Sequence, residues 1–136
     1  RNENSSGSQW HHDGRRFEVA TSCIPLGADL RSSLELLEEL GNAQQRQALI
    51  CERSARLWNG LQQIPGVQTV VKEAPPASGL VSFTIDHTPA QAAVSALADQ
   101  HFQLRSLEDP LCLRACTHVF STESEIDQLL EAISQL

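Results

Sequence analysis

Arg114 is the residue whose type and position point most directly to chemistry. It lies in the apolar run LCLRACTHV (111–119), where alternation predicts a β-strand with Arg114 between Cys112 and Cys116 on one face. A buried guanidinium is costly unless it meets an anion, and its planar fork suits a carboxylate held by two parallel hydrogen bonds. Arg114 is therefore a candidate carboxylate anchor. An ion pair with an acid such as Glu108, or an edge-strand arginine in water, remains open.

Other residues that could bind a metal or form disulfides give weaker signals. The four cysteines are widely spaced and have apolar neighbours: Cys23, Cys51, Cys112 and Cys116. No CxxC pair occurs, and no His/Cys spacing matches a zinc pattern. His11, His12 and Asp13 are adjacent, so in an extended segment neighbouring side chains point opposite ways. We expect no metal site, reduced thiols and a cytoplasmic protein.

Composition limits the classes of protein to which the chain could belong. Its 136 residues suffice for one domain, and 40% of them are hydrophobic. The net charge of −7 disfavours a nucleic-acid partner. No apolar run is long enough to cross a membrane, and the first residues lack the apolar region of a secretory signal. Because methionine is absent and the chain begins at Arg1, we expect a fragment of a larger protein.

The first part of the chain is expected to carry two helices. Residues 1–14 are polar and predict a flexible loop or tail, whereas 15–136 predict one domain that starts with extended chain over 15–25. Leucines at helical spacing predict a helix over 28–40. Asn42 and Gln45 predict a capping box for a second helix that ends near residue 64.

The remaining elements alternate between strands and helices. Strands are predicted over 67–71, 79–86, 101–107 and 111–119, with a turn at Asp109-Pro110. Capping boxes are predicted for two further helices, from Thr88 to Gln91 and from Thr122 to Glu125. The fold class is therefore α+β: a small three- to four-stranded, mainly antiparallel sheet with helices packed on one face.

Three motifs, in this order, resemble the class V aminotransferase family of pyridoxal-phosphate (PLP) enzymes. GRRFEVAT (14–21) resembles the R-F-E-x-G-T segment, SGLVSF (78–83) a strand of that family, and LCLRACTHVFSTESEIDQLLEAI (111–133) its C-terminal signature. The sequences of these motifs are most similar to those of cyanobacterial cysteine/cystine C–S lyases. The resemblance implies the C-terminal small domain of a fold-type I PLP enzyme. Ala20 and Thr117 depart from it, because many members have Gly and Pro there.

The resemblance also implies roles for individual residues. Arg114 matches the arginine that binds the substrate α-carboxylate, and Arg105 matches a second arginine that faces the substrate. His118 is expected to shape the turn after the last strand. Arg16 and Glu18 are expected to have structural roles at the domain junction.

Two absences bear on the chemistry. The stretch SLEDPL (106–111) lacks the nucleophilic cysteine of the family's desulfurases, and Cys112 and Cys116 lie in a strand where packing would make a thiol less reactive. Lys72 is the only lysine and is expected at the surface, with no glycine-rich phosphate cradle in the chain. We therefore expect no catalytic residue, no bound PLP and no activity in the isolated chain.

The resulting functional hypothesis concerns the complete enzyme. The chain is expected to be a fragment of a PLP-dependent C–S lyase that closes the active site and binds an amino-acid substrate. The missing large PLP domain and a second copy in a homodimer would be its partners. The exact substrate, and the choice among β-elimination, transamination and epimerisation, stay open. The alternative is a non-enzymatic small α+β interaction or regulatory module.

Overall fold

The computed structural model describes residues 11–17 and 23–136, which belong to two compact units, 1–36 and 37–136. In the first unit, the 3-10 helix η1 (Gly14–Phe17) follows Asp13, whose carboxylate pairs with the Arg15 guanidinium at 2.8 Å. Helix α1 (Ile24–Glu39) begins four residues before the predicted start. Pro25 lies in its first turn, where proline leaves no helical hydrogen bond unmade. The prediction of extended chain over 15–25 was therefore wrong for residues 15–17 and 24–25.

Some predictions concern residues that the structure does not describe. Most of the expected flexible tail, together with Glu18 and Ala20, lies outside the described residues. Arg16 is described, and its guanidinium lies 4.7 Å from the ring centre of Phe17. In the described part of the chain, no helix has the length and apolar character that a membrane span requires.

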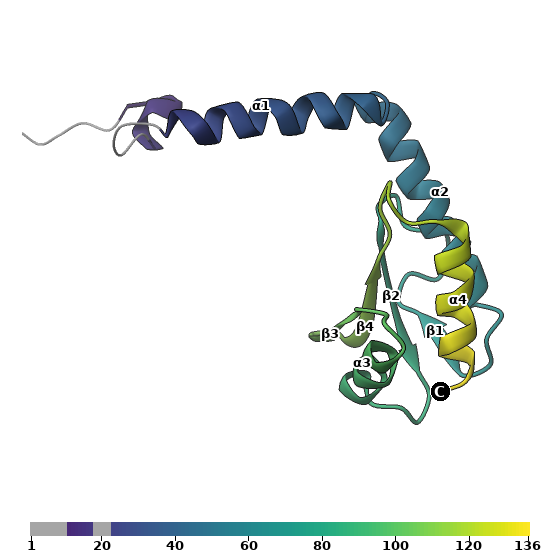
Figure 1. Cartoon of the computed structure of the whole chain (residues 1–136). Helices are drawn as coiled ribbons and strands as arrows, with labels where there is room; N and C mark the ends of the chain where they lie inside the picture. Colours follow the sequence, from purple (N-terminus) through teal and green to yellow (C-terminus); the bar gives the residue numbers. More distant parts are fainter. Residues whose placement is uncertain (1–10, 18–22) are drawn as a thin grey trace, which may run out of the picture. The chain divides into compact units, whose positions relative to one another are not determined.

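The second unit contains the predicted order of helices and strands (Figure 1). After α1, its elements are α2 (Ala43–Leu61), β1 (Val67–Thr69), β2 (Leu80–Ile85), α3 (Ala90–Asp99), β3 (Arg105–Glu108), β4 (Leu111–Cys116) and α4 (Glu123–Ser134). Most strands are a few residues shorter than predicted.

The four strands form one antiparallel sheet in the order β1-β2-β4-β3. Val67 faces Ile85 across β1 and β2, and Phe83 faces Leu113 across β2 and β4. The predicted Asp109-Pro110 turn, with a cis peptide bond, joins β3 to β4. The α+β fold class with a small antiparallel sheet is confirmed. Because β4 lies between β2 and β3, Arg114 is not on an edge strand.

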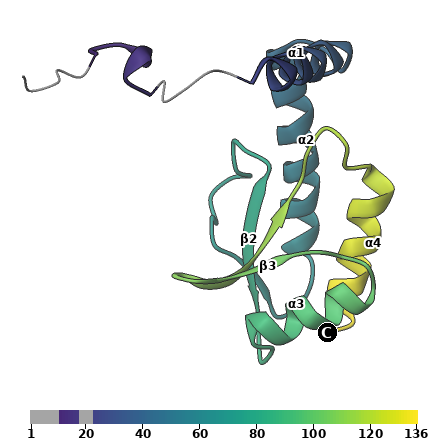
Figure 2. The ribbon, with the colours of Figure 1, turned by 60° about the vertical axis from the view of Figure 1, so that its left-hand side comes forward.

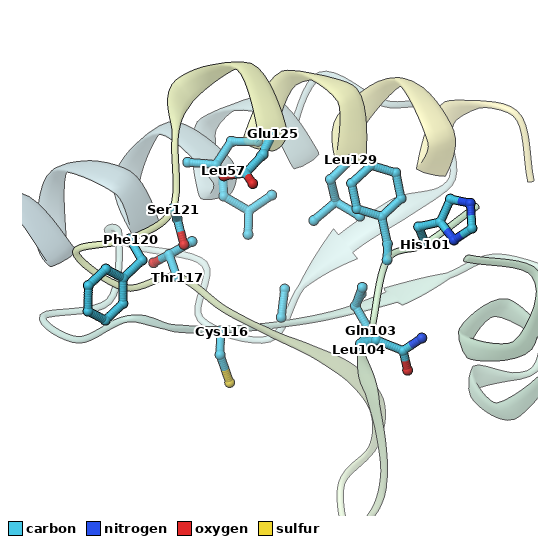
Figure 3. A pocket seen from close by; sticks show the side chains of 13 residues that line it. Leu57, His101, Gln103, Leu104, Cys116, Thr117, Phe120, Ser121, Glu125 and Leu129 are labelled. Atoms are coloured by element: carbon cyan, nitrogen blue, oxygen red, sulfur yellow. The ribbon is translucent and has the colours of Figure 1, made fainter. Parts of the chain in front are cut away.

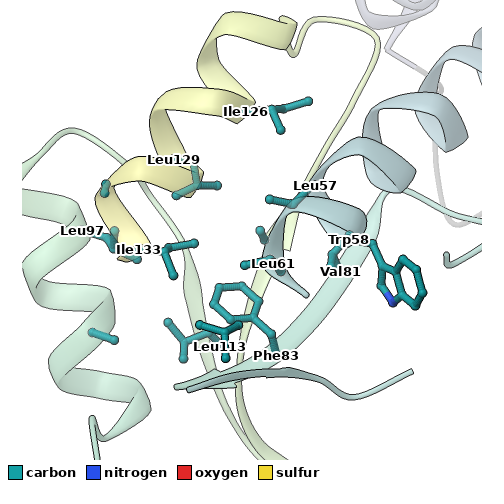
Figure 4. Packing of buried hydrophobic residues seen from close by; sticks show 14 of the residues in the cluster. Leu57, Trp58, Leu61, Val81, Phe83, Leu97, Leu113, Ile126, Leu129 and Ile133 are labelled. Atoms are coloured by element: carbon teal, nitrogen blue, oxygen red, sulfur yellow. The ribbon is translucent and has the colours of Figure 1, made fainter. Parts of the chain in front are cut away.

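The hydrophobic core lies between one face of the sheet and helices α2, α3 and α4 (Figure 4). From the sheet it takes alternate residues of the two central strands, Val81, Phe83, Leu113 and Ala115, as the period of two predicts. From the helices it takes one apolar face of each: Leu57, Leu61, Ala93, Leu97, Ile126, Leu129 and Ile133. Full burial of each large side chain stabilises the fold by about 1.5–3 kcal/mol. The candidate site lies on the face of the sheet opposite these helices.

Helix α4 is fixed to α2 at its N-terminal end (Figure 2). Thr122 and Glu125 form the predicted capping box. Three ion pairs then connect the helices. The Arg53 Nη1 atom lies 2.7 Å from one Glu123 carboxylate oxygen, the Arg56 Nη1 atom lies 3.1 Å from the other, and Arg56 binds Asp127 through two hydrogen bonds. Asn42 and Gln45 form the predicted box at the start of α2.

The region around α3 contains two departures from the predictions. Pro89, not Thr88, is the N-cap, and no side chain caps it. Instead of closing a box, the Gln91 Oε1 atom accepts a hydrogen bond from the Ser106 hydroxyl at 2.8 Å. After α3, His101 has a φ of 71°, and the predicted strand begins only at Arg105. A turn at His101 and irregular chain over 102–104 therefore replace the first four residues of that strand.

Gly79 marks a close approach between the chain before β2 and the chain after β4. The Thr117 N–H donates to the Gly79 carbonyl at 2.7 Å, a bond that the proline of many family members could not donate. A Cβ atom at position 79 would collide with the Thr117 carbonyl oxygen. Only glycine fits this position without a backbone shift.

Candidate functional site

The sheet face opposite the helices carries the predicted arginines. Leu113 and Ala115 of β4 point into the core, so Cys112, Arg114 and Cys116 point to the other face. Ser82 of β2 lies directly across from Arg114 and shares that face. The predicted division of β4 into two faces is therefore confirmed.

Arg105 and Arg114 lie directly opposite each other on the paired strands β3 and β4. Like charges at such positions repel each other, which destabilises the strand pair unless an anion lies between them. Neither arginine forms an ion pair with an acid among residues 11–17 and 23–136. Glu108 falls on the other face of β3, because it is an odd number of residues from Arg105.

The Arg114 guanidinium is half-buried and incompletely satisfied. Its Nε atom is buried and has no hydrogen-bond partner among the described residues. The Nε atom of Arg53 is also buried without a partner, but that guanidinium is held by Glu123 through Nη1. A carboxylate that approached the end of the side chain would accept from the two Nη atoms, which are not buried. Arg114 therefore combines a free donor with an unbalanced charge.

The register that brings the arginines together has a signal in the sequence. A two-residue connection at Asp109-Pro110 places Glu108 opposite Leu111 and, three pairs further along, Arg105 opposite Arg114. The alternation of β4 predicts the face on which Arg114 lies, but only the hairpin register predicts that Arg105 lies opposite it.

The turn after β4 is built by the backbone of His118. Its N–H donates to the Ser121 hydroxyl, and its carbonyl accepts from the Ser121 N–H, each at 3.0 Å. The His118 ring stacks on Phe120 with ring centres 5.2 Å apart. These contacts agree with a role in shaping the turn.

A pocket of about 330 Å³ opens beside this turn (Figure 3). It lies between α4, the segment 101–104 and the end of β4, on the helix side of the sheet, whereas Arg114 points to the other side. The buried side chains of Leu57, Ile126 and Leu129 also line it. The sequence did not predict this pocket, because its pattern extends a paired strand over 101–104.

The cysteines and the lysine set limits on the chemistry. Cys112 is 1% exposed, but Cys116 is exposed, so the expectation that packing encloses both thiols was wrong for Cys116. Lys72 is exposed in the loop after β1. No three or more His, Cys, Asp and Glu side chains gather at a metal-binding geometry in the described ranges. The chain's only lysine therefore lacks the enclosed surroundings that a PLP Schiff base requires.

This α+β fold is shared by solved PLP enzymes. A complex of the cystine C–S lyase C-DES with cysteine persulfide is 42% identical, with a TM-score of 0.84 over 95% of this chain. A C-DES variant with glycine covalently linked to its PLP cofactor is 41% identical, with a TM-score of 0.83 over 99% of the chain. The sequence matches the aminotransferase class V family over residues 2–129. The chain belongs to that family.

More distant structures and the lengths of the relatives complete the comparison. The Escherichia coli cysteine desulfurase CsdA is 21% identical, with a TM-score of 0.73 over 87% of this chain and 31% of its own, which shows a shared fold. No curated protein matches the sequence. The chain spans about a third of the two lyase structures, 34% and 35% of their lengths.

Proposed function

We propose that this chain is the C-terminal small domain, residues 15–136, of a PLP-dependent C–S lyase that acts on cystine or a related sulfur amino acid. In the complete enzyme it closes over the active site and binds the substrate α-carboxylate through Arg114. The observation that carries the proposal is the buried, unpartnered Nε atom of Arg114, directly across the sheet from Arg105. The two C-DES structures, with cysteine persulfide and with PLP-linked glycine, support this substrate class.

The two arginines have different tasks in this proposal. Arg114 is half-buried on a central strand, so its neighbours hold the guanidinium in one orientation toward the carboxylate. Arg105 is exposed on the edge strand β3 and adds a second positive charge next to the same anion. A bound carboxylate would accept hydrogen bonds from the Arg114 guanidinium and offset the repulsion between the two cations.

The cofactor would be held by other parts of the complete enzyme. The residues of this chain do not fit PLP, because Lys72 is exposed on a loop and is the only lysine. When bound, PLP supplies the electron sink for bond cleavage next to the substrate nitrogen. The contribution of this chain is to bind and orient the substrate. A homodimer of the complete enzyme, as in our expectation from the sequence, belongs to the same proposal.

The proposal is tested in a chimera in which this chain replaces the matching third of the C-DES lyase. Arg114→Lys keeps the charge but loses the two-pronged hydrogen bonding. We expect kcat/KM for cystine to fall about 30- to 150-fold, the equivalent of roughly 2–3 kcal/mol. The thermal midpoint should change little, because the side chain serves the ligand.

Arg56→Lys is the matched control, since this arginine pairs with Asp127 between α2 and α4, away from the arginine face. It should leave kcat/KM unchanged. Normal kinetics in the Arg114→Lys chimera, or an equal loss in the Arg56→Lys chimera, would contradict the role of Arg114.

A further inference from the structure

Leu80 and Cys116 form an exposed pair beside Arg114, on the same face of the sheet. Leu80 lies directly across from Cys116, and the next pair on this face is Ser82 with Arg114. Two residues along a strand span about 6–7 Å. Leu80 is 48% exposed, and Cys116 is also exposed, with its side chain pointing away from the helix side of the sheet (Figure 3). These two residues are called the Leu80–Cys116 pair below.

Along β4, the surface beside Arg114 is closed at one end and open at the other. Cys112, two residues before Arg114, is 1% exposed. Toward Cys116 the sheet becomes narrower, because the last pair between β3 and β4 is Arg105 with Arg114. A ligand whose carboxylate is held at Arg114 therefore finds free surface toward the Leu80–Cys116 pair and not toward Cys112.

Hydrogen bonds hold the chain next to this pair in place. The Thr117 N–H and hydroxyl both donate to the Gly79 carbonyl, at 2.7 and 3.3 Å. The Leu80 N–H donates to the Ser78 hydroxyl at 3.3 Å. The pair is therefore a preformed surface, and a preformed surface loses little free energy to ordering when a ligand binds.

The chemistry of the pair suits an apolar or sulfur-containing group. Leucine offers only hydrocarbon, and a cysteine thiol behaves as a small hydrophobe with a weak donor. A hydroxyl group pressed against these side chains would lose hydrogen bonds to water without replacing them. The pair therefore favours sulfur or carbon over a hydroxyl oxygen.

We propose that the Leu80–Cys116 pair contacts the atom beyond Cβ of the amino-acid substrate and determines the preference for sulfur at that position. In an amino acid this atom is only a few bonds from the carboxylate, so a carboxylate bound at Arg114 brings it near the neighbouring pair of residues. The inference rests on the proposed function, because it requires the carboxylate at Arg114.

Two amino acids that differ only at this atom test the preference in the C-DES chimera. Serine carries a hydroxyl group on Cβ and 2-aminobutyrate a methyl group, whereas the carboxylate and the amino group are the same. Each is measured as a competitive inhibitor of cystine cleavage. In the wild-type chimera, 2-aminobutyrate should bind at least about tenfold more tightly than serine. Leu80→Asn should reduce this ratio to about threefold or less, because the amide can bond the hydroxyl group.

Leu111→Asn is the matched control, since Leu111 is 70% exposed at the start of β4 and falls on the other face from Arg114. It should leave the ratio unchanged. Cys116→Ser replaces only sulfur by oxygen and covers the case in which Leu80→Asn prevents the chimera from folding. It should lower the ratio at least about twofold.

Equal inhibition by the two amino acids in the wild-type chimera would overturn the proposal. A ratio that neither Leu80→Asn nor Cys116→Ser changes, or that Leu111→Asn changes equally, would also overturn it. Arg114→Lys separates this failure from that of the proposed function, because it should weaken both inhibitors by the same factor. Unchanged inhibition by both amino acids in Arg114→Lys would contradict the carboxylate anchor, whereas weakened inhibition with an unchanged ratio in Leu80→Asn would contradict the specificity alone.

Discussion

Helices α1 and α4 have similar amphipathic sequences and opposite surroundings. On α1, Leu26, Leu30 and Leu34 are more than half exposed, whereas on α4 Ile126, Leu129 and Ile133 are 3%, 8% and 2% exposed. α4 also has a capping box and ion pairs to α2. An apolar row in the sequence therefore indicates that a helix has a packing face. It does not indicate that the same chain supplies the surface that covers this face.

The largest expected effect is the loss of a side chain from the buried row of α4. Ile133→Ala should lower the free energy of unfolding of the 136-residue chain by about 2–5 kcal/mol, because it leaves a cavity in the core. Leu30→Ala, on α1, should change it by no more than about 0.5 kcal/mol. Urea unfolding followed by circular dichroism measures both. Equal losses would show that α1 packs as tightly as α4.

The cap of α4 should matter less than its core. Thr122→Ala removes the side chain that accepts from the Glu125 N–H and should cost about 1 kcal/mol of unfolding free energy. Thr88→Ala is the comparison, since Thr88 precedes α3 without capping it. We expect the same urea titration to show a smaller loss for Thr88→Ala. A larger loss would mean that Thr88 has a capping role.

The smallest effect should come from the exposed ion pairs, and it should depend on pH. The hydrogen bonds from the Arg56 guanidinium lower the pKa of Asp127 below its ordinary value of 3.8. A carboxylate with a lowered pKa stabilises the fold above its unfolded pKa, and this contribution is lost as pH falls through the folded value. The stability difference between the wild type and Asp127→Asn should therefore narrow as pH is lowered from about 5 to 2.

The control for the pH series lies on α1. Glu35 pairs with Arg31 at 2.8 Å on the exposed surface of that helix. Glu35→Gln should reproduce the wild-type pH profile of the urea midpoint. A constant difference between the wild type and Asp127→Asn at every pH would show that the Arg56 pair does not stabilise the fold.

Local signals in the sequence predicted most of this fold. The capping boxes of Asn42 and Thr122 were correct because each depends on residues three apart. The box predicted at Thr88 was wrong because Gln91 bonds instead to Ser106, fifteen residues away. A contact at that distance along the chain depends on how α3 packs against β3, and no local pattern contains it.

The sequence also predicted part of the candidate site, but not all of it. Alternation in β4 identified Arg114 and its face, and the family resemblance added Arg105. The pocket beside His118 was not predictable, since it depends on where residues 101–104 leave the line of β3. The exposure of Cys116 likewise depends on which residues cover the end of β4, and those come from distant parts of the chain.

Gly79 has a consequence for engineering this chain. In a saturation library, position 79 should tolerate glycine alone, because any larger residue would force Thr117 away and open the β2–β4 ladder from its end. Gly14 and Gly27, which have nothing within 4 Å of an added Cβ, should accept many residues. A library that varies substrate preference should therefore keep glycine at position 79, because a shift of Thr117 would disturb the strand that carries Arg114 three residues earlier.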